Sequence, residues 1–173
     1  SAAVKALSEG PLDALVTAPI NKKNIQGPGF DFPGHTEYLA SVLGGEPLMF
    51  LVSEDLKIAV ATGHISISEV AGAITPQLIE QKIKQMEQSL VKDFSVAKPR
   101  IAVLGLDPHN GAEGVIGTTD RDVIPPAVDK LFSQGHYVFG PYSADGFFGS
   151  GAYKSFDATL AMYHDQGLIP FKT

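Results

Sequence analysis

The chain contains both short apolar runs and longer stretches with a periodic apolar pattern. Together these patterns predict alternating strands and helices. Apolar runs of strand length, most of them bounded by glycine, proline or polar residues, occur at residues 13–18, 48–53, 57–62, 101–106, 137–139 and 157–163. The connection Ser53-Glu54-Asp55 is short enough for a hairpin. Part of the sheet should therefore be antiparallel.

Helix signals lie between these runs. The strongest is Thr75-Pro76, which supplies an N-cap and a first-turn proline before a stretch with a 3.6-residue apolar period. Ser66 and Glu69 have the spacing of a capping box. Further helices are expected from Ala2 to Ser8, from the start Gly34-His35-Thr36-Glu37 through Tyr38 to Leu43, between a Thr119 or Asp120 cap and Gly135, and weakly at 147–155.

Interleaved strands and helices place the chain in the α/β class. We expect a mixed sheet flanked by helices, with residues 1–173 forming a single domain. Prolines at Pro11, Pro19, Pro28 and Pro33 are expected in loops or at the ends of elements.

Composition narrows the class of protein. An apolar content of 44% and a charged content of 18% exclude a disordered chain. A net charge of −6 argues against non-specific nucleic-acid binding, but not against a small anionic substrate. The chain has no cysteine, which excludes thiolate chemistry. Since the apolar runs are far shorter than a membrane span and no signal peptide precedes the first strand, a cytoplasmic enzyme is expected.

Three of the five histidines, His64, His109 and His164, follow the ends of apolar strand-like runs. Ligands of open α/β sheets bind outside the carboxyl ends of the strands. Three neutral imidazoles and an open position are the pattern of a catalytic metal site. A lone histidine there is more often structural, and the long spacings match no local metal motif. Asp107, Asp145 and Asp165 could orient the imidazoles or bind the metal directly, and the alternative for Asp107 and Asp145 is that they are turn residues.

A second group of residues could bind an anion. His35 and Thr36 open a predicted helix, and Lys172 follows the last predicted strand. Backbone N–H groups, a hydroxyl and an ammonium are the usual parts of a phosphate site. The alternative is that Thr36 caps its helix and Lys172 is solvated. Asn21-Lys22 could form either a turn or a contact to an anion, and the sequence does not decide between them. The chain has neither a Walker loop nor the glycine-rich dinucleotide fingerprint.

Several motifs resemble the 4-hydroxythreonine-4-phosphate dehydrogenase family of the pyridoxal-phosphate pathway. They run in order along nearly the whole chain: Ala18-Pro19-Ile20-Asn21-Lys22, Gly34-His35-Thr36-Glu37, Ala61-Thr62-Gly63-His64, Leu106-Asp107-Pro108-His109-Asn110-Gly111, Gly140-Pro141-Tyr142-Ser143-Ala144-Asp145 and Tyr163-His164-Asp165-Gln166-Gly167-Leu168-Ile169-Pro170-Phe171-Lys172. No single motif is decisive, but the combination is specific.

The resemblance implies a fold like that of isocitrate and isopropylmalate dehydrogenases. It implies a divalent metal (zinc, magnesium or cobalt) on His64, His109 and His164, in a site shared between the subunits of a homodimer. Substrate contacts would come from His35, Thr36 and Lys172, with Asp145 as an active-site acid. Family members are about twice as long. The chain is therefore expected to be a central fragment of a two-domain dehydrogenase and could be inactive alone.

The resemblance also implies a reaction. The family oxidises the secondary alcohol of 4-phosphooxy-L-threonine with NAD or NADP, and the 3-oxo acid loses CO₂ to give 3-amino-2-oxopropyl phosphate. Asp145 and Lys172 are both candidates for the group that takes the hydroxyl proton. The residues that bind the nucleotide are not assigned.

Three alternatives stay open. A related dehydrogenase of 4-phospho-D-threonate or phospho-erythronate would share the metal and phosphate motifs. A three-histidine metallohydrolase would need a metal-bound water and no nicotinamide. A non-catalytic interaction domain would bind no metal.

Overall fold

The structure is a computed structural model that describes residues 2–10, 12–27, 29–32 and 34–173. Pro11, Pro28 and Pro33, predicted at loop positions, lie outside these ranges. The chain forms two compact units, Ser1–Pro47 and Leu48–Thr173. Each has packing of its own, and the expectation of a single domain stays a prediction.

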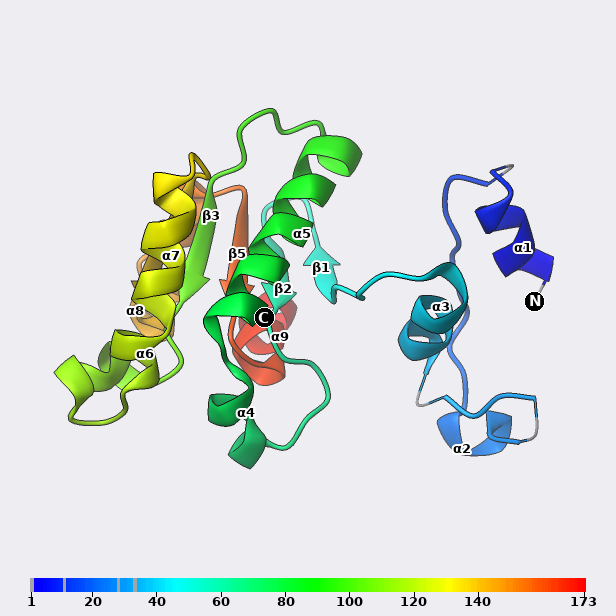
Figure 1. Cartoon of the computed structure of the whole chain (residues 1–173), viewed down its shortest axis with the longest axis horizontal. Coiled ribbons are helices and arrows are strands. Elements are labelled where there is room, and N and C mark those ends of the chain that lie inside the picture. Colours follow the sequence, from blue (N-terminus) through cyan, green and yellow to red (C-terminus); the bar gives the residue numbers. More distant parts are fainter. Residues whose placement is uncertain (1, 11, 28, 33) are drawn as a thin grey trace. The chain divides into compact units, whose positions relative to one another are not determined.

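The first unit is small and helical. It contains α1 (Ala2–Ser8), α2 (Lys22–Ile25) and α3 (His35–Leu43), drawn in blue to teal in Figure 1. α1 and α3 agree with the predicted helices. Phe30, Phe32 and Tyr38 pack together with ring centroids 5.4–5.6 Å apart. This aromatic cluster anchors the start of α3, because edge-on and tilted ring pairs add to the burial of their apolar surface.

The predicted buried strand at residues 13–18 is wrong. These residues are irregular, and Val16 is 95% exposed. No described strand pairs with them. A strand is stabilised by its ladder and by cross-strand side-chain pairs, so an apolar run without a partner strand stays irregular.

Within the described residues, the second unit carries a five-stranded sheet of order β1-β2-β5-β3-β4. Its strands are β1 (Phe50–Val52), β2 (Lys57–Val60), β3 (Ile101–Leu104), β4 (Val138–Tyr142) and β5 (Ala158–Ala161). β1 is antiparallel to β2, and every other pairing is parallel. The mixed sheet and the hairpin are both confirmed. The parallel strands place their carboxyl ends along one edge.

Helices cover both faces of this sheet (Figure 1). They are α4 (Ile67–Ala73), α5 (Pro76–Phe94), α6 (Thr119–Asp122), α7 (Ile124–Ser133), α8 (Ala144–Gly149) and α9 (His164–Lys172), with 3-10 turns η1 (Pro108–Gly114) and η2 (Ala152–Ser155). The predicted capping box of Ser66 and Glu69 is present. The Thr75 hydroxyl accepts from the Leu78 N–H at 3.2 Å. Local capping chemistry therefore fixed these two helix starts.

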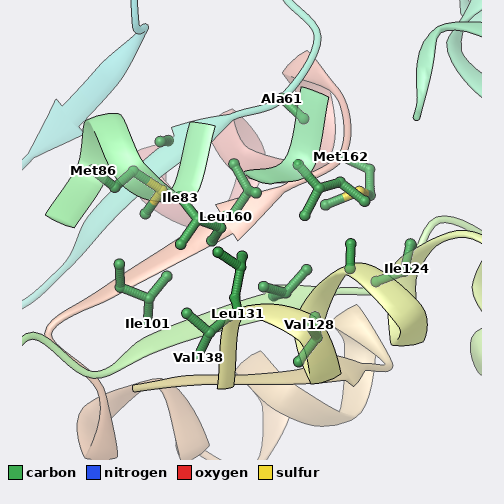
Figure 2. Close-up of a cluster of buried hydrophobic side chains, with 14 of the residues drawn as sticks. Ala61, Ile83, Met86, Ile101, Ile124, Val128, Leu131, Val138, Leu160 and Met162 are labelled. Atoms are coloured by element: carbon green, nitrogen blue, oxygen red, sulfur yellow. The ribbon is translucent and has the colours of Figure 1, made fainter. Parts of the chain in front are cut away.

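Alternate residues of each strand feed two hydrophobic clusters. Ile101 and Val103 of β3 join α5 and α7 on one face (Figure 2). Ala102 and Leu104 join α8 and α9 on the other. Each fully buried aliphatic side chain contributes about 1.5–3 kcal/mol. The sheet is thus held rigidly from both sides, and its carboxyl edge is a stable platform.

No helix is predicted after the last strand, yet α9 begins at His164. Gly167 and Pro170 are poor helix formers, so the sequence does not predict a helix here. Tertiary packing favours it, because a Cβ on Gly167 would lie 2.9 Å from Val60 Cγ1 and 3.0 Å from Ile58 Cγ2. The glycine therefore lets α9 lie directly on β2. Within the described residues, no helix is long and apolar enough to cross a membrane.

Candidate active site

Four candidate residues follow the carboxyl ends of four neighbouring strands. His64 follows β2, His164 follows β5, His109 follows β3 and Asp145 follows β4. This edge is where α/β sheets bind ligands, because loops there diverge while the strands fix their starting points. The sheet order thus accounts for why residues up to 100 positions apart gather in one region.

His64 and His164 face each other, with ring centroids 5.2 Å apart. This separation suits two ligands of one metal ion. With a metal–nitrogen bond of about 2.0–2.1 Å and about 1.1 Å from nitrogen to ring centre, two tetrahedral imidazole ligands have centroids about 5.2 Å apart. An open hollow of about 330 Å³ adjoins the pair and is also lined by Tyr163 and Asp165.

His164 has a partner that fixes its ring. Its Nδ1 lies 2.8 Å from Oδ1 of Asp165. A carboxylate on one imidazole nitrogen orients the ring and leaves Nε2 for a metal, which is the usual arrangement around metal-bound histidines. This contact agrees with the orienting role that the sequence allows for Asp165, which stays a prediction.

His109 lies in an adjoining hollow of about 320 Å³, which it shares with Asp107 and Asp145. Tyr163 lines both hollows. His109 opens an unusual run of left-handed backbone, with φ of 54° at His109, 52° at Asn110, 45° at Ala112 and 56° at Glu113. Non-glycine residues in this region cost about 1–2 kcal/mol each. Strained backbone of this kind is concentrated at functional sites.

The three predicted metal ligands are only partly brought together. Among the described residues, no three histidine, cysteine, aspartate or glutamate side chains already form a metal-binding group. The structure pairs His64 with His164 and places His109 in the adjoining hollow. The third ligand stays a prediction.

Asp145 is held as a carboxylate. Its Oδ1 accepts from the Ser143 hydroxyl at 2.6 Å and from the Gly146 N–H at 2.7 Å. These hydrogen bonds, with the nearby His109, hold the pKa of Asp145 below its usual range. An ionised carboxylate beside His109 favours binding of a cation in this hollow.

Asp120 has a role that differs from the predicted one. It was expected as a possible helix cap, but its buried carboxylate accepts from the Leu106 N–H at 2.7 Å and the Asp107 N–H at 2.6 Å. Gly105 lacks a side chain, which leaves room for this carboxylate. Burial raises the pKa of Asp120, although the two backbone donors act in the opposite direction. Asp120 thus ties the start of the His109 loop to α6.

Replacing Asp120 with asparagine is expected to destabilise the protein by about 1–3 kcal/mol, because the amide nitrogen cannot accept an N–H, whereas both oxygens of a carboxyl group, ionised or protonated, can. The raised pKa means that the folded state holds the Asp120 proton more tightly. Its favourable contribution is complete below the unfolded pKa and is lost as pH rises through the folded pKa. The deficit of the variant should therefore be largest at acidic pH.

Urea unfolding of the wild type and D120N across pH 3.5–7 measures this difference. D129N, at an exposed acid of α7, should change stability by less than about 0.5 kcal/mol. An equal loss in both variants would exclude a specific role of the Asp120 carboxylate.

The predicted anion-binding residues are spread over both units. His35 and Thr36 occupy the first turn of α3, where Gly34 is the N-cap residue, so Thr36 does not cap the helix. Lys172 is exposed at the end of α9, eight residues or about 12 Å along the helix from His164. Their substrate contacts stay predictions. Asn21 caps α2 through hydrogen bonds of 3.1 Å to Lys23 N and Asn24 N, while the Lys22 side chain lies outside the described part of the chain.

Two residues of the site region were missed by sequence reasoning. Gln166 forms side-chain hydrogen bonds to Met162 N and Gly105 O, both at 2.7 Å. Tyr163 lines both hollows. Both stand beside His164 in the sequence, but only the fold shows that the glutamine reaches a strand 61 positions away.

Comparison with known proteins gives consistent matches over the whole chain. A family model described as "Pyridoxal phosphate biosynthetic protein PdxA" matches residues 1–173. A Bacteroides thetaiotaomicron protein named 4-hydroxythreonine-4-phosphate dehydrogenase is 48% identical over 172 residues, which are 98% of this chain and 47% of that protein.

Solved structures of similar proteins agree with these sequence matches. A 4-hydroxythreonine-4-phosphate dehydrogenase from Klebsiella pneumoniae matches with a TM-score of 0.89 and 35% identity, over 99% of this chain and 53% of that one. A terephthalate 1,2-cis-dihydrodioldehydrogenase from Burkholderia xenovorans LB400 matches with a TM-score of 0.77 and 31% identity, over 99% and 54%. The α/β fold class is confirmed. The chain spans about half the length of the relatives that it matches.

Proposed function

We propose a function from one premise, that this chain belongs to the pyridoxal phosphate biosynthetic protein PdxA family. The whole protein oxidises the secondary alcohol of 4-phosphooxy-L-threonine, transferring hydride to NAD or NADP and a proton to a basic group. The product, 2-amino-3-oxo-4-phosphooxybutanoate, then loses CO₂ to give 3-amino-2-oxopropyl phosphate. The observation that carries the proposal is the His64–His164 pair at ligand spacing in a chain whose relatives are named dehydrogenases.

His64 and His164 hold a divalent metal in this proposal, with His109 as the third ligand. A bound divalent cation supplies the positive charge that makes a substrate hydroxyl easier to deprotonate. Asp165 orients His164 through the 2.8 Å contact. We further propose that the whole protein is a homodimer and that the two subunits share this site.

His35, Thr36 and Lys172 bind the anionic groups of the substrate. The helix start at His35 offers free N–H groups, and Lys172 offers an ammonium. A phosphate held away from the reacting carbon positions the alcohol and lowers the entropic barrier of the reaction.

The proton acceptor is one of two residues. Asp145 is stabilised as a carboxylate by Ser143 and Gly146, and a lowered pKa makes it a weak base. Its place beside His109 better suits holding a cation. Lys172 is the other candidate, and it would accept the proton as a free amine, not as the ammonium that binds an anion.

The reaction is tested with the full-length protein, a divalent metal and NAD or NADP. We expect NAD(P)H absorbance to appear with 4-phosphooxy-L-threonine and to be at least about tenfold slower with unphosphorylated 4-hydroxy-L-threonine. Turnover of 4-phospho-D-threonate or phospho-erythronate instead would identify the related dehydrogenase. Release of inorganic phosphate without NAD(P)H would identify a hydrolase and overturn the proposal.

A further inference from the structure

We propose that Gln166 is a positioning residue whose side-chain amide sets the spacing between the two hollows of the site. The proposal rests on the metal-binding function proposed above. Gln166 lies in the first turn of α9, two residues after His164. It contacts the residues that directly follow β3 and β5, and it lines the His109 hollow.

The Gln166 amide bridges the residues that follow the paired parts of β3 and β5. The last paired residues of these strands are Val103 and Leu160. Continuing that register places Gly105 opposite Met162. There Oε1 of Gln166 accepts from Met162 N, and Nε2 donates to Gly105 O, each at 2.7 Å. The side-chain amide thus links the two strand ends beyond their last backbone pairing and fixes how far they separate.

This separation controls the site because each strand end leads to a predicted ligand. β5 leads through Met162 to His164, and β3 leads through Gly105 to His109. The Met162 carbonyl is also held from the other side, by the Thr62 hydroxyl at 2.8 Å. The end of β5 is therefore anchored toward β2, and the Gln166 side chain bridges it to Gly105, the residue that follows β3.

The chemistry requires an amide at this position. One end of the side chain must accept from an N–H and the other must donate to a carbonyl, which a side-chain amide does without any change of protonation. A glutamate at 166 would keep the contact to Met162 N but place a second oxygen against Gly105 O. A leucine would keep the approximate volume and lose both hydrogen bonds.

The test compares Q166E and Q166L with L168A in the full-length, metal-free protein. Leu168 lies in the same helix, packs against the second hydrophobic cluster and has an apolar side chain that makes no hydrogen bond to Met162 or Gly105. L168A therefore controls for general loosening of α9. Cobalt(II) affinity is measured by absorption titration, and stability by urea unfolding of the same samples.

We expect both Gln166 variants to bind cobalt about 10–100-fold more weakly, as for other residues that orient metal ligands. L168A should stay within about threefold of the wild type at a similar loss of stability. Unchanged cobalt affinity in Q166E, or an equal loss in L168A, would overturn the positioning role. If Q166L does not fold, Q166E decides. If the wild-type protein itself binds no cobalt, the proposed metal site is also wrong. Failure of the metal site is therefore distinguished from failure of the positioning role of Gln166 alone.

Discussion

Replacing His164 with alanine is expected to remove the bound metal and to lower turnover of the full-length enzyme by about 10²–10⁴-fold. His164 supplies one of the two imidazoles at ligand spacing, and Asp165 orients its ring. A metal ion provides several kcal/mol of charge stabilisation, and about 1.4 kcal/mol corresponds to a factor of ten in rate. Metal content by plasma mass spectrometry and NAD(P)H formation measure the two effects.

His136 offers a matched control. Its Nδ1 lies 2.7 Å from Oε2 of Glu87, so it has the same kind of carboxylate partner as His164. It precedes β4 and therefore lies by the amino end of that strand, away from the carboxyl edge. H136A should keep its metal and most of its activity. Equal loss of metal in H136A and H164A would show that the effect comes from lost stability, and would contradict the assignment of His164 as a ligand.

Replacing Gly140 with alanine is expected to destabilise the protein by about 3 kcal/mol or more. Gly140 lies in β4 with φ of 143°, a conformation that alanine rarely adopts. A Cβ there would also overlap the backbone carbonyl of Val103 in the adjacent strand β3. Strain at such a position costs about 1–3 kcal/mol and overpacking about as much again. Urea unfolding measures the loss.

Gly149 is the matched control for Gly140. It ends α8, and a Cβ at this position would meet nothing within 4 Å. G149A should change stability by no more than about 1 kcal/mol in either direction. A G140A variant as stable as G149A would mean that β3 and β4 do not approach as closely as described, and that the strand leading to Asp145 is placed differently.

Local signals predicted those parts of the fold that local chemistry determines. The capping box of Ser66 and Glu69, the Thr75-Pro76 start and the hairpin between β1 and β2 need only neighbours in sequence. The prediction of a strand at residues 13–18 was wrong because a strand needs a partner strand to pair with, and apolar composition does not indicate whether one is present. α9 was missed because its packing on β2 outweighs the low helix propensity of Gly167 and Pro170.

The candidate site was predictable where position in an α/β sheet carries the information. His64, His109 and His164 were singled out because each follows an apolar run, and the sheet order places those runs side by side. Asp120 and Gln166 could not be found in this way. At the end of β3, Asp120 contacts residues 13 and 14 positions away in the sequence, and Gln166 contacts a residue 61 positions away. No local sequence spacing indicates either contact.

The metal assignment is tested most directly by anomalous scattering from crystals of the full-length protein soaked in cobalt(II) or zinc(II). We predict one strong peak within about 2.0–2.2 Å of an imidazole nitrogen of His64 and of His164, with His109 of the same or the neighbouring subunit as the third ligand. A map at saturating metal with no peak between His64 and His164, or with its main peak elsewhere, would contradict the account.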